Sequence, residues 1–96
     1  MSAYVLIIRD ETKDPVGMEN YRAIAKDVPT LKMDILVSKS CNFKVLEGSE
    51  PESIVVMHFP SVDDALEWYQ SEAYQEALPH RIAAANTRVI IAEGLD

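Results

Sequence analysis

Two apolar runs constrain the fold of this chain more than any other feature of its sequence. Residues 3–9 and 53–59 each have the length of a strand and carry apolar side chains at both odd and even positions. A strand that is apolar on both parities is typical of the interior of a sheet, because an edge strand carries more charge. We therefore expect these runs to be the two central strands of one sheet.

The remaining strands are predicted from shorter patterns. Residues 31–37 alternate apolar and polar side chains, which is typical of a half-buried strand. Residues 87–93 contain Val89, Ile90 and Ile91 and predict a last strand. The sheet is therefore expected to have four strands.

Helical periodicity separates the predicted strands. A first helix is expected from Asp14 and Pro15, an N-cap followed by proline at the first helical position, to a stop at Pro29. A second helical region begins after Ser61, whose side chain can cap it. The proline at position 79 is expected to interrupt that region and to open a further short helix.

The predicted elements follow one another in the order β-α-β-β-α-β. Two right-handed crossovers around a β-hairpin give a ferredoxin-like sandwich, an α+β fold with a four-stranded antiparallel sheet and helices on one face. A length of 96 residues leaves room for one domain, residues 1–96. In this topology the first and third strands are central, in agreement with the two apolar runs.

One face of such a sheet carries no helices. We expect that face to expose Val5, Ile7, Val55 and Met57, which together form an apolar patch. A contiguous apolar patch marks an interface. The sequence therefore predicts a homodimer through the open sheet face, a dimeric α+β barrel, and a charge introduced by Val55→Asp is expected to break it.

Charge and composition argue against several function classes. The net charge of −7, with basic residues scattered along the sequence, argues against nucleic-acid binding and against docking on anionic membranes. The apolar run at the N-terminus is too short for a signal peptide or a membrane span. One Cys and two His cannot build a Cys-rich metal site, and no nucleotide-binding motif is present. We therefore expect no cofactor, no metal and a cytoplasmic location.

Several stretches of the chain resemble one protein family. They are Leu46-Glu47-Gly48, Ile54 to Ser61, Ala65 to Ser71, Tyr74-Gln75, Arg81 and Val89 to Gly94. Together they are similar to domain-of-unknown-function family 1330, a group of small, mostly bacterial proteins. The resemblance implies a protomer of the dimeric α+β barrel superfamily and implies no particular reaction. Family members usually carry a longer, glycine-containing segment where this chain has residues 29–34.

A pocket between the sheet and the helices is the expected place for a small molecule. The candidate ligand-binding residues are Trp68, Tyr69, Ser71, Tyr74, Arg81 and His58. Trp68 and Tyr69 are either aromatic walls of the pocket or packed core residues. The resemblance favours Ser71, Tyr74 and Arg81 belonging together.

Arg81 and His58 are the candidates for chemistry. Arg81 could hold a carboxylate or an enolate. Alternatively, it could pair with Glu72, Glu76 or Glu93, or with carbonyl groups at a helix end. His58 could act as a general base if its side of the strand faces the helices, or it could be a buried histidine with a structural role.

Two functions follow from these candidates. The sequence favours a non-catalytic dimer that binds a small molecule, because no acid–base pair is visible at helical or strand spacing. The alternative is a cofactor-independent enzyme, monooxygenase- or isomerase-like, that acts on a small aromatic or keto-acid substrate. His58 would be its base and Arg81 its anion clamp, so both should line one cavity if this alternative holds.

Overall fold

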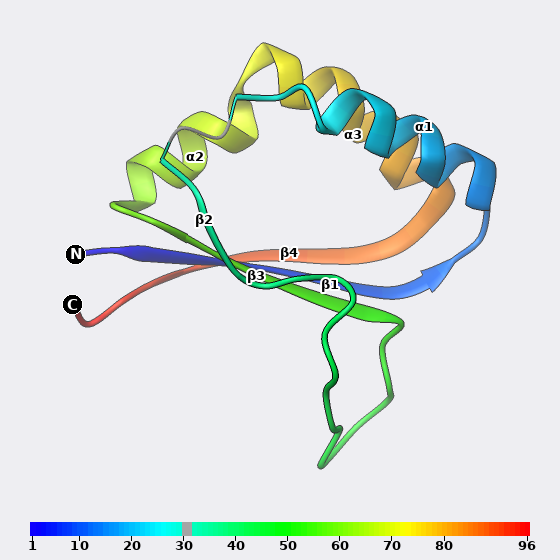
Figure 1. The fold of residues 1–96 in the computed structure, drawn as a ribbon, viewed down its shortest axis with the longest axis horizontal. Coiled ribbons are helices and arrows are strands. Elements are labelled where there is room, and N and C mark those ends of the chain that lie inside the picture. Colours follow the sequence, from blue (N-terminus) through cyan, green and yellow to red (C-terminus); the bar gives the residue numbers. More distant parts are fainter. Residues whose placement is uncertain (30–31) are drawn as a thin grey trace.

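The fold is described here for residues 1–29 and 32–96 of a computed structural model. Thr30 and Leu31, inside the glycine-free segment 29–34, lie outside the described residues. The elements, in chain order, are β1 (Ala3–Thr12), α1 (Pro15–Ala25), β2 (Asp34–Val37), β3 (Ser53–Phe59), α2 (Val62–Gln70), α3 (Glu72–Ala84) and β4 (Ala85–Glu93). The helices form a layer over one face of the sheet (Figure 1).

The sheet has the strand order β2-β3-β1-β4, and every neighbouring pair is antiparallel. β1 and β3 are the central strands, with Val5 opposite Met57 in the register. This order confirms the ferredoxin-like α+β fold predicted from the element sequence. The two strands that are apolar on both parities are the two that have a neighbour on each side.

Short polar side chains begin two of the three helices. Ser61 accepts a hydrogen bond through Oγ from the backbone N–H of Asp64, at 3.1 Å, and caps α2. Ser71 does the same for α3 through the N–H of Tyr74, at 3.2 Å. Asp14 occupies the N-cap position of α1, as predicted, but its side chain makes no capping hydrogen bond.

The predicted break at Pro79 is wrong. Pro79 lies inside α3, which runs from Glu72 to Ala84 as one helix. Its exposed position leaves the carbonyl that loses its usual donor on the solvent side, where water can satisfy it. Tyr74 and Arg81, seven positions apart, therefore lie on one buried face of a continuous helix.

The expected assignment of the two sheet faces is also wrong. Val5 and Met57, predicted for the open face, are 0% and 4% exposed and belong to the main core beneath the helices. Ile7 and Val55 pack against the same core. Both parities of β1 and β3 are apolar, so the alternation alone did not distinguish the two faces.

The open face carries the other parity of the strands. Leu6 lies opposite both Val56 and Ile90, and Ile8 lies opposite Ile54. Ile90 is 46% exposed, and the other four are only partly buried. In Figure 1 the connection between β2 and β3 projects from the sheet on the side away from the helices. The apolar open face predicted from the sequence therefore exists, but different residues form it.

Candidate functional site

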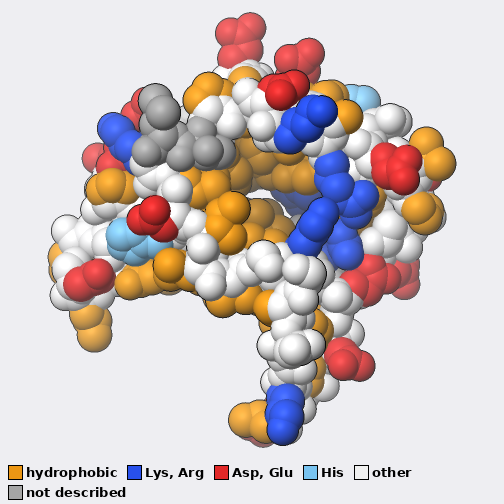
Figure 2. Space-filling view, viewed as in Figure 1, with side chains coloured by type: hydrophobic (Ala, Val, Ile, Leu, Met, Phe, Trp, Pro, Cys, Tyr) orange, Lys and Arg blue, Asp and Glu red, His pale blue; other side chains and the backbone are white. Residues whose placement is uncertain are grey.

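Two pockets lie between the helical layer and the sheet, near opposite ends of β3. The larger has a volume of about 260 Å³ and the smaller about 120 Å³. Phe59 at the end of β3 lines the larger pocket, whereas Ser53 and Val55 near its start line the smaller one. Figure 2 shows a hollow between the helices and the sheet, with hydrophobic side chains in its walls and basic side chains along one side.

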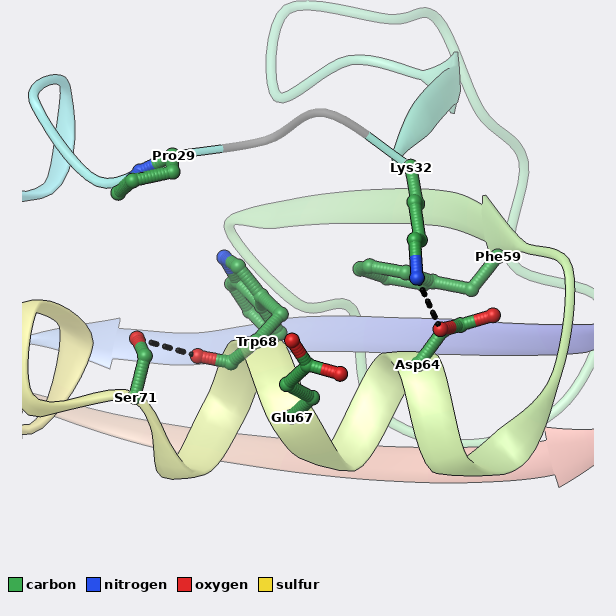
Figure 3. A pocket seen from close by; sticks show the side chains of 7 residues that line it. All are labelled: Pro29, Lys32, Phe59, Asp64, Glu67, Trp68 and Ser71. Carbon is green, nitrogen blue, oxygen red and sulfur yellow. Dashed lines mark hydrogen bonds and ion pairs between the residues drawn. The ribbon is translucent and has the colours of Figure 1, made fainter.

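The larger pocket has an aromatic wall and charged residues at its edge. Its lining residues are Pro29, Lys32, Phe59, Asp64, Glu67, Trp68 and Ser71 (Figure 3). The ring of Trp68 packs against Phe59, with ring centroids 5.8 Å apart, and against Tyr74 at 4.5 Å. These contacts hold the indole in place as part of the core.

Three polar side chains of the larger pocket, Lys32, Asp64 and Ser71, already have hydrogen-bond partners, and Glu67 is exposed to water. Lys32 donates a hydrogen bond to Asp64 at 2.9 Å, drawn as a dashed line in Figure 3. The hydrogen bond from Lys32 and a second one from Ser61 hold the pKa of Asp64 below its usual value. The same bond with Asp64 raises the pKa of Lys32. Ser71 donates through Oγ to the Trp68 carbonyl oxygen, at 2.8 Å.

The smaller pocket draws its lining from six segments of the chain. Ile7 and Arg9 come from β1, and Ser53 and Val55 come from β3. Further lining residues are Met18, Tyr21 and Arg22 from α1, Lys39 from the connection after β2, Arg81 from α3 and Thr87 from β4. The apolar side chains and the basic side chains therefore share one small space.

Arg81 is the most deeply buried charge of this pocket. Arg81 is 5% exposed, and its Nε has no hydrogen-bond partner among the described residues. Among residues 1–29 and 32–96, no carboxylate forms an ion pair with it, so the predicted pairing with Glu72, Glu76 or Glu93 is not found. The guanidinium lies over the Tyr21 ring, with Cζ 5.7 Å from the ring centroid.

Tyr21 connects this pocket to the aromatic core. Its hydroxyl is 2.8 Å from the Tyr74 hydroxyl. Burial, reinforced by the Tyr74 hydroxyl, raises the pKa of Tyr21 far above its ordinary value, although the Arg81 guanidinium acts in the opposite direction. The phenol therefore stays neutral at physiological pH and cannot act as a general base there.

The predicted site residues separate into three places. Trp68 and Ser71 line the larger pocket, and Arg81 lines the smaller one. Tyr74 is 1% exposed and lies in the core, with the half-buried Tyr69 packed on it at 5.5 Å between ring centroids. These residues share the helical layer without forming one cavity.

The expectation that His58 faces the helices is wrong. Its neighbours Met57 and Phe59 are buried beneath the helices, so alternation along β3 turns His58 to the open face. There its Nδ1 is 3.6 Å from an oxygen of Asp34, and its ring packs on Tyr4 with centroids 5.3 Å apart. His58 and Arg81 therefore lie on opposite sides of the sheet.

The basic residues of the smaller pocket were missed because they are far apart in the sequence. Arg9, Arg22 and Lys39 seemed scattered, and only the fold brings them together with Arg81. One signal was available in the strands. Arg9, Ser53 and Thr87 are polar positions on the parity of Val5 and Met57, and polar residues on a core-facing parity indicate a lined space.

The part of the chain that the structure describes lacks two other kinds of feature. It holds no group of three or more His, Cys, Asp or Glu side chains that could bind a metal ion. None of its helices has the length and apolar character needed to cross a bilayer.

The same fold is found in proteins of known structure. A protein of unknown function from Rhodopseudomonas palustris superposes with a TM-score of 0.68 at 24% identity, over 99% of this chain and 83% of that one. An ethyl tert-butyl ether d (EthD) family protein from Bacillus halodurans gives a TM-score of 0.64 at 10% identity, over 99% and 100%. A dimeric ferredoxin-like protein of unknown function from Thermobifida fusca gives 0.62 at 11%, over 96% and 90%.

These neighbours define the class: a ferredoxin-like α+β protein of the kind that includes dimers. A search of curated proteins finds no match to the chain. The family follows from the sequence itself, because residues 2–95 match the family model of DUF1330, a domain of unknown function. The chain belongs to this family, as its resemblance indicated.

Proposed function

We propose that the protein binds a small organic molecule in the smaller pocket and acts as a binding protein rather than an enzyme. The observation that carries this proposal is a set of buried polar atoms without partners. Arg81 Nε and Thr87 Oγ1 are inaccessible and have no hydrogen-bond partner among the described residues, and both residues line this pocket. Arg9 Nε is also inaccessible and forms no hydrogen bond there, although it lies 3.3 Å from Oε1 of Glu52. Buried donors without partners are rare and costly, which favours a ligand that supplies acceptors.

The larger pocket is a weaker candidate despite its volume. Its charged pair, Lys32 and Asp64, is internally satisfied, and Ser71 uses its hydroxyl to cap α3. Among the described residues that line this volume of about 260 Å³, none has a buried polar side-chain atom without a partner. Both pockets are smaller than the roughly 300–1,000 Å³ of sites for drug-sized ligands, which favours a small ligand.

Binding is favoured over catalysis by the residue types at the pocket. Its described lining residues include no carboxylate, histidine or cysteine, which are among the side chains that most often act as general bases. The enzyme alternative required His58 and Arg81 in one cavity, and they lie on opposite faces of the sheet. No observation favours that alternative in its place.

The binding unit that we propose is a homodimer joined through the open sheet face. The apolar side chains of that face, Leu6, Ile8, Ile54, Val56 and Ile90, form the kind of patch that a second sheet covers. A structural neighbour from Thermobifida fusca is described as dimeric, which supports this arrangement.

A single cysteine, Cys41, allows no internal disulfide and is consistent with a cytoplasmic protein.

Mapping bound compounds by two-dimensional NMR tests the ligand site. Small neutral, cationic and anionic compounds are titrated into isotopically labelled protein. We expect the compounds that bind to shift the backbone amide resonances of the protein around Arg9, Ser53 and Thr87. A cluster around Phe59 and Trp68, or on the open face, would contradict the assignment, as would the absence of any binding.

Two filled-pocket variants give the matched control. Val55→Phe places a larger side chain at the smaller pocket, and Glu67→Phe does so at the larger one. We expect Val55→Phe to remove binding and Glu67→Phe to leave it unchanged. The same NMR spectra check that both variants are folded, so unchanged binding by a folded Val55→Phe variant counts against the proposal.

A further inference from the structure

The smaller pocket concentrates positive charge in a chain whose net charge is −7. Four of the nine Lys and Arg residues line it: Arg9, Arg22, Lys39 and Arg81. They come from β1, α1, the connection after β2 and α3, so the folded structure alone brings them together. None of the lining residues is acidic. Such a concentration of one sign in a concave site attracts ligands of the opposite sign.

The nearest acidic residue neutralises this charge only in part. Glu52 lies 3.3 Å from Arg9, measured between Oε1 and Nε. Its side chain is 42% exposed, does not line the pocket, and also accepts a hydrogen bond from Thr12 at 2.6 Å. Among the described parts of the chain, no ion pair involves Arg22, Lys39 or Arg81.

Arg81 carries the argument for an anion. Arg81 is 5% exposed and so has lost most of its hydration, and that loss is unfavourable unless a negative group compensates for it. The contact with the Tyr21 ring provides some attraction but no counter-charge. The Nε of Arg81 has no partner among the described residues, and Arg9 has only the partly exposed Glu52 beside it. Each guanidinium is a planar fork that matches the two oxygens of a carboxylate.

The apolar residues of the lining indicate which kind of group the anionic ligand carries beside its charge. Ile7, Met18 and Val55 supply an apolar wall beside the basic side chains. A fully hydrated inorganic anion gains nothing from such a wall, whereas a short hydrocarbon or aromatic body does. A volume of about 120 Å³ leaves room for a small molecule only.

We infer that the smaller pocket binds a small organic carboxylate, with the carboxylate between Arg81 and Arg9 and its apolar body against Ile7, Met18 and Val55. This inference rests on the proposed function and adds the chemical class of the ligand. Thr87 and Ser53 add hydroxyl groups at the same site. Arg22 and Lys39, which are less buried, attract the anion from the rim.

Calorimetric titration with matched pairs of compounds tests the inference. Benzoate and hexanoate are compared with benzamide and hexanamide, which have similar shapes but no charge. We expect each carboxylate to bind at least about tenfold more tightly than its amide, since hydrogen bonds to charged groups exceed neutral ones by that order. We also expect the affinity to fall as the salt concentration rises.

Each other outcome overturns a defined part of the argument. Equal binding of amide and carboxylate overturns the inference but leaves a ligand pocket. Binding of only neutral or cationic compounds does the same. If inorganic phosphate competes with benzoate and binds equally tightly, the ligand class is a phosphate and the inferred carboxylate is wrong. If no compound of any charge binds in this pocket, the proposed function fails as well.

Variants separate a binding role of Arg81 from a structural one. Arg81→Gln is expected to weaken benzoate binding roughly tenfold to a hundredfold. It should leave the stability of the free protein equal or higher, because it removes an unpaired buried charge. A structural role predicts the reverse, lower stability with unchanged affinity in the folded fraction.

Two substitutions of surface residues provide a second test if Arg81→Gln does not fold. Lys39 is exposed, and Lys39→Gln is expected to weaken benzoate binding about twofold to fivefold, as is usual for a rim charge. Arg88→Gln is the control, because Arg88 is exposed, lies outside the pocket and pairs with Asp10. Equal affinities of the Lys39→Gln and Arg88→Gln variants would contradict the role of the basic rim.

Discussion

Gly17 sets the distance between two helices by having no side chain. A Cβ at this position would lie 2.9 Å from the Cβ of Ala84 in α3 and 3.0 Å from Oδ2 of Asp14. The alanine side chain cannot rotate away, so any larger residue must push α1 and α3 apart. Arg81 lies one helical turn before Ala84, which links this packing to the position of the buried charge.

We expect Gly17→Ala to destabilise the protein although alanine is the better helix former. Alanine gains about 1 kcal/mol of helix propensity, and overpacking costs roughly 1–3 kcal/mol, so a net loss of about 1 kcal/mol is expected. Asn20→Ala, at an exposed position of α1, is the control and should gain a few tenths of a kcal/mol or change nothing. Urea denaturation measures both variants, and a Gly17→Ala protein at least as stable as the wild type would contradict the close packing.

At the scale of elements, the continuity of α3 decides what the helical layer presents to the sheet. The sequence predicted the order of the elements, because their periodicities and caps are local. It did not predict that α3 continues through Pro79, because solvation of a freed carbonyl depends on the exposed position of that turn. Tyr74 and Arg81 were therefore expected on separate segments, whereas one helix presents both.

Ser71 tests whether a predicted site residue is a ligand contact or a structural cap. Its Oγ accepts from the N–H of Tyr74 at 3.2 Å and donates to the Trp68 carbonyl oxygen at 2.8 Å. We expect Ser71→Ala to lower the free energy of unfolding by about 1 kcal/mol, as is typical for loss of an N-cap. Ser49→Ala, in an exposed loop, should have no effect.

Ligand affinity distinguishes the two roles of Ser71. If Ser71 is only a cap, the affinity of the folded Ser71→Ala variant for compounds in the smaller pocket is unchanged. If the variant keeps normal stability but no longer binds these compounds, Ser71 contributes to ligand binding, as the sequence suggested. Thermal denaturation followed by circular dichroism, together with calorimetric titration, measures both quantities.

At the scale of the whole molecule, the sequence predicted an open apolar face but assigned it the wrong residues. Each central strand has apolar side chains on both parities, and one parity is buried by the helices and the other by the proposed partner. Only the packing of Val5 and Met57 beneath the helices identifies which is which. The proposed ligand pocket could not be predicted from local patterns either, because its basic residues meet only in the assembled fold.

The corrected face assignment changes which substitution should break the proposed dimer. Val56→Asp places a charge on the open face, and we expect a folded protein of half the native mass. Val55→Asp, on the helix-facing side, should instead destabilise each protomer. Ile82→Asp, at a position of α3 that is 62% exposed, is the control and should remain dimeric. Light scattering coupled to size-exclusion chromatography gives the masses, and a dimeric Val56→Asp protein would exclude this interface.

The aromatic contacts of Trp68 also provide an optical reporter. Trp68 is the single tryptophan of the chain, and its ring lies 4.5 Å from that of Tyr74, whose hydroxyl is 2.8 Å from that of Tyr21 at the smaller pocket. The tryptophan fluorescence of the protein therefore originates at one position, and two tyrosines separate it from the proposed ligand. A compound that shifts Tyr21 will change the emission of this indole, so occupancy of the pocket can be followed in unlabelled protein.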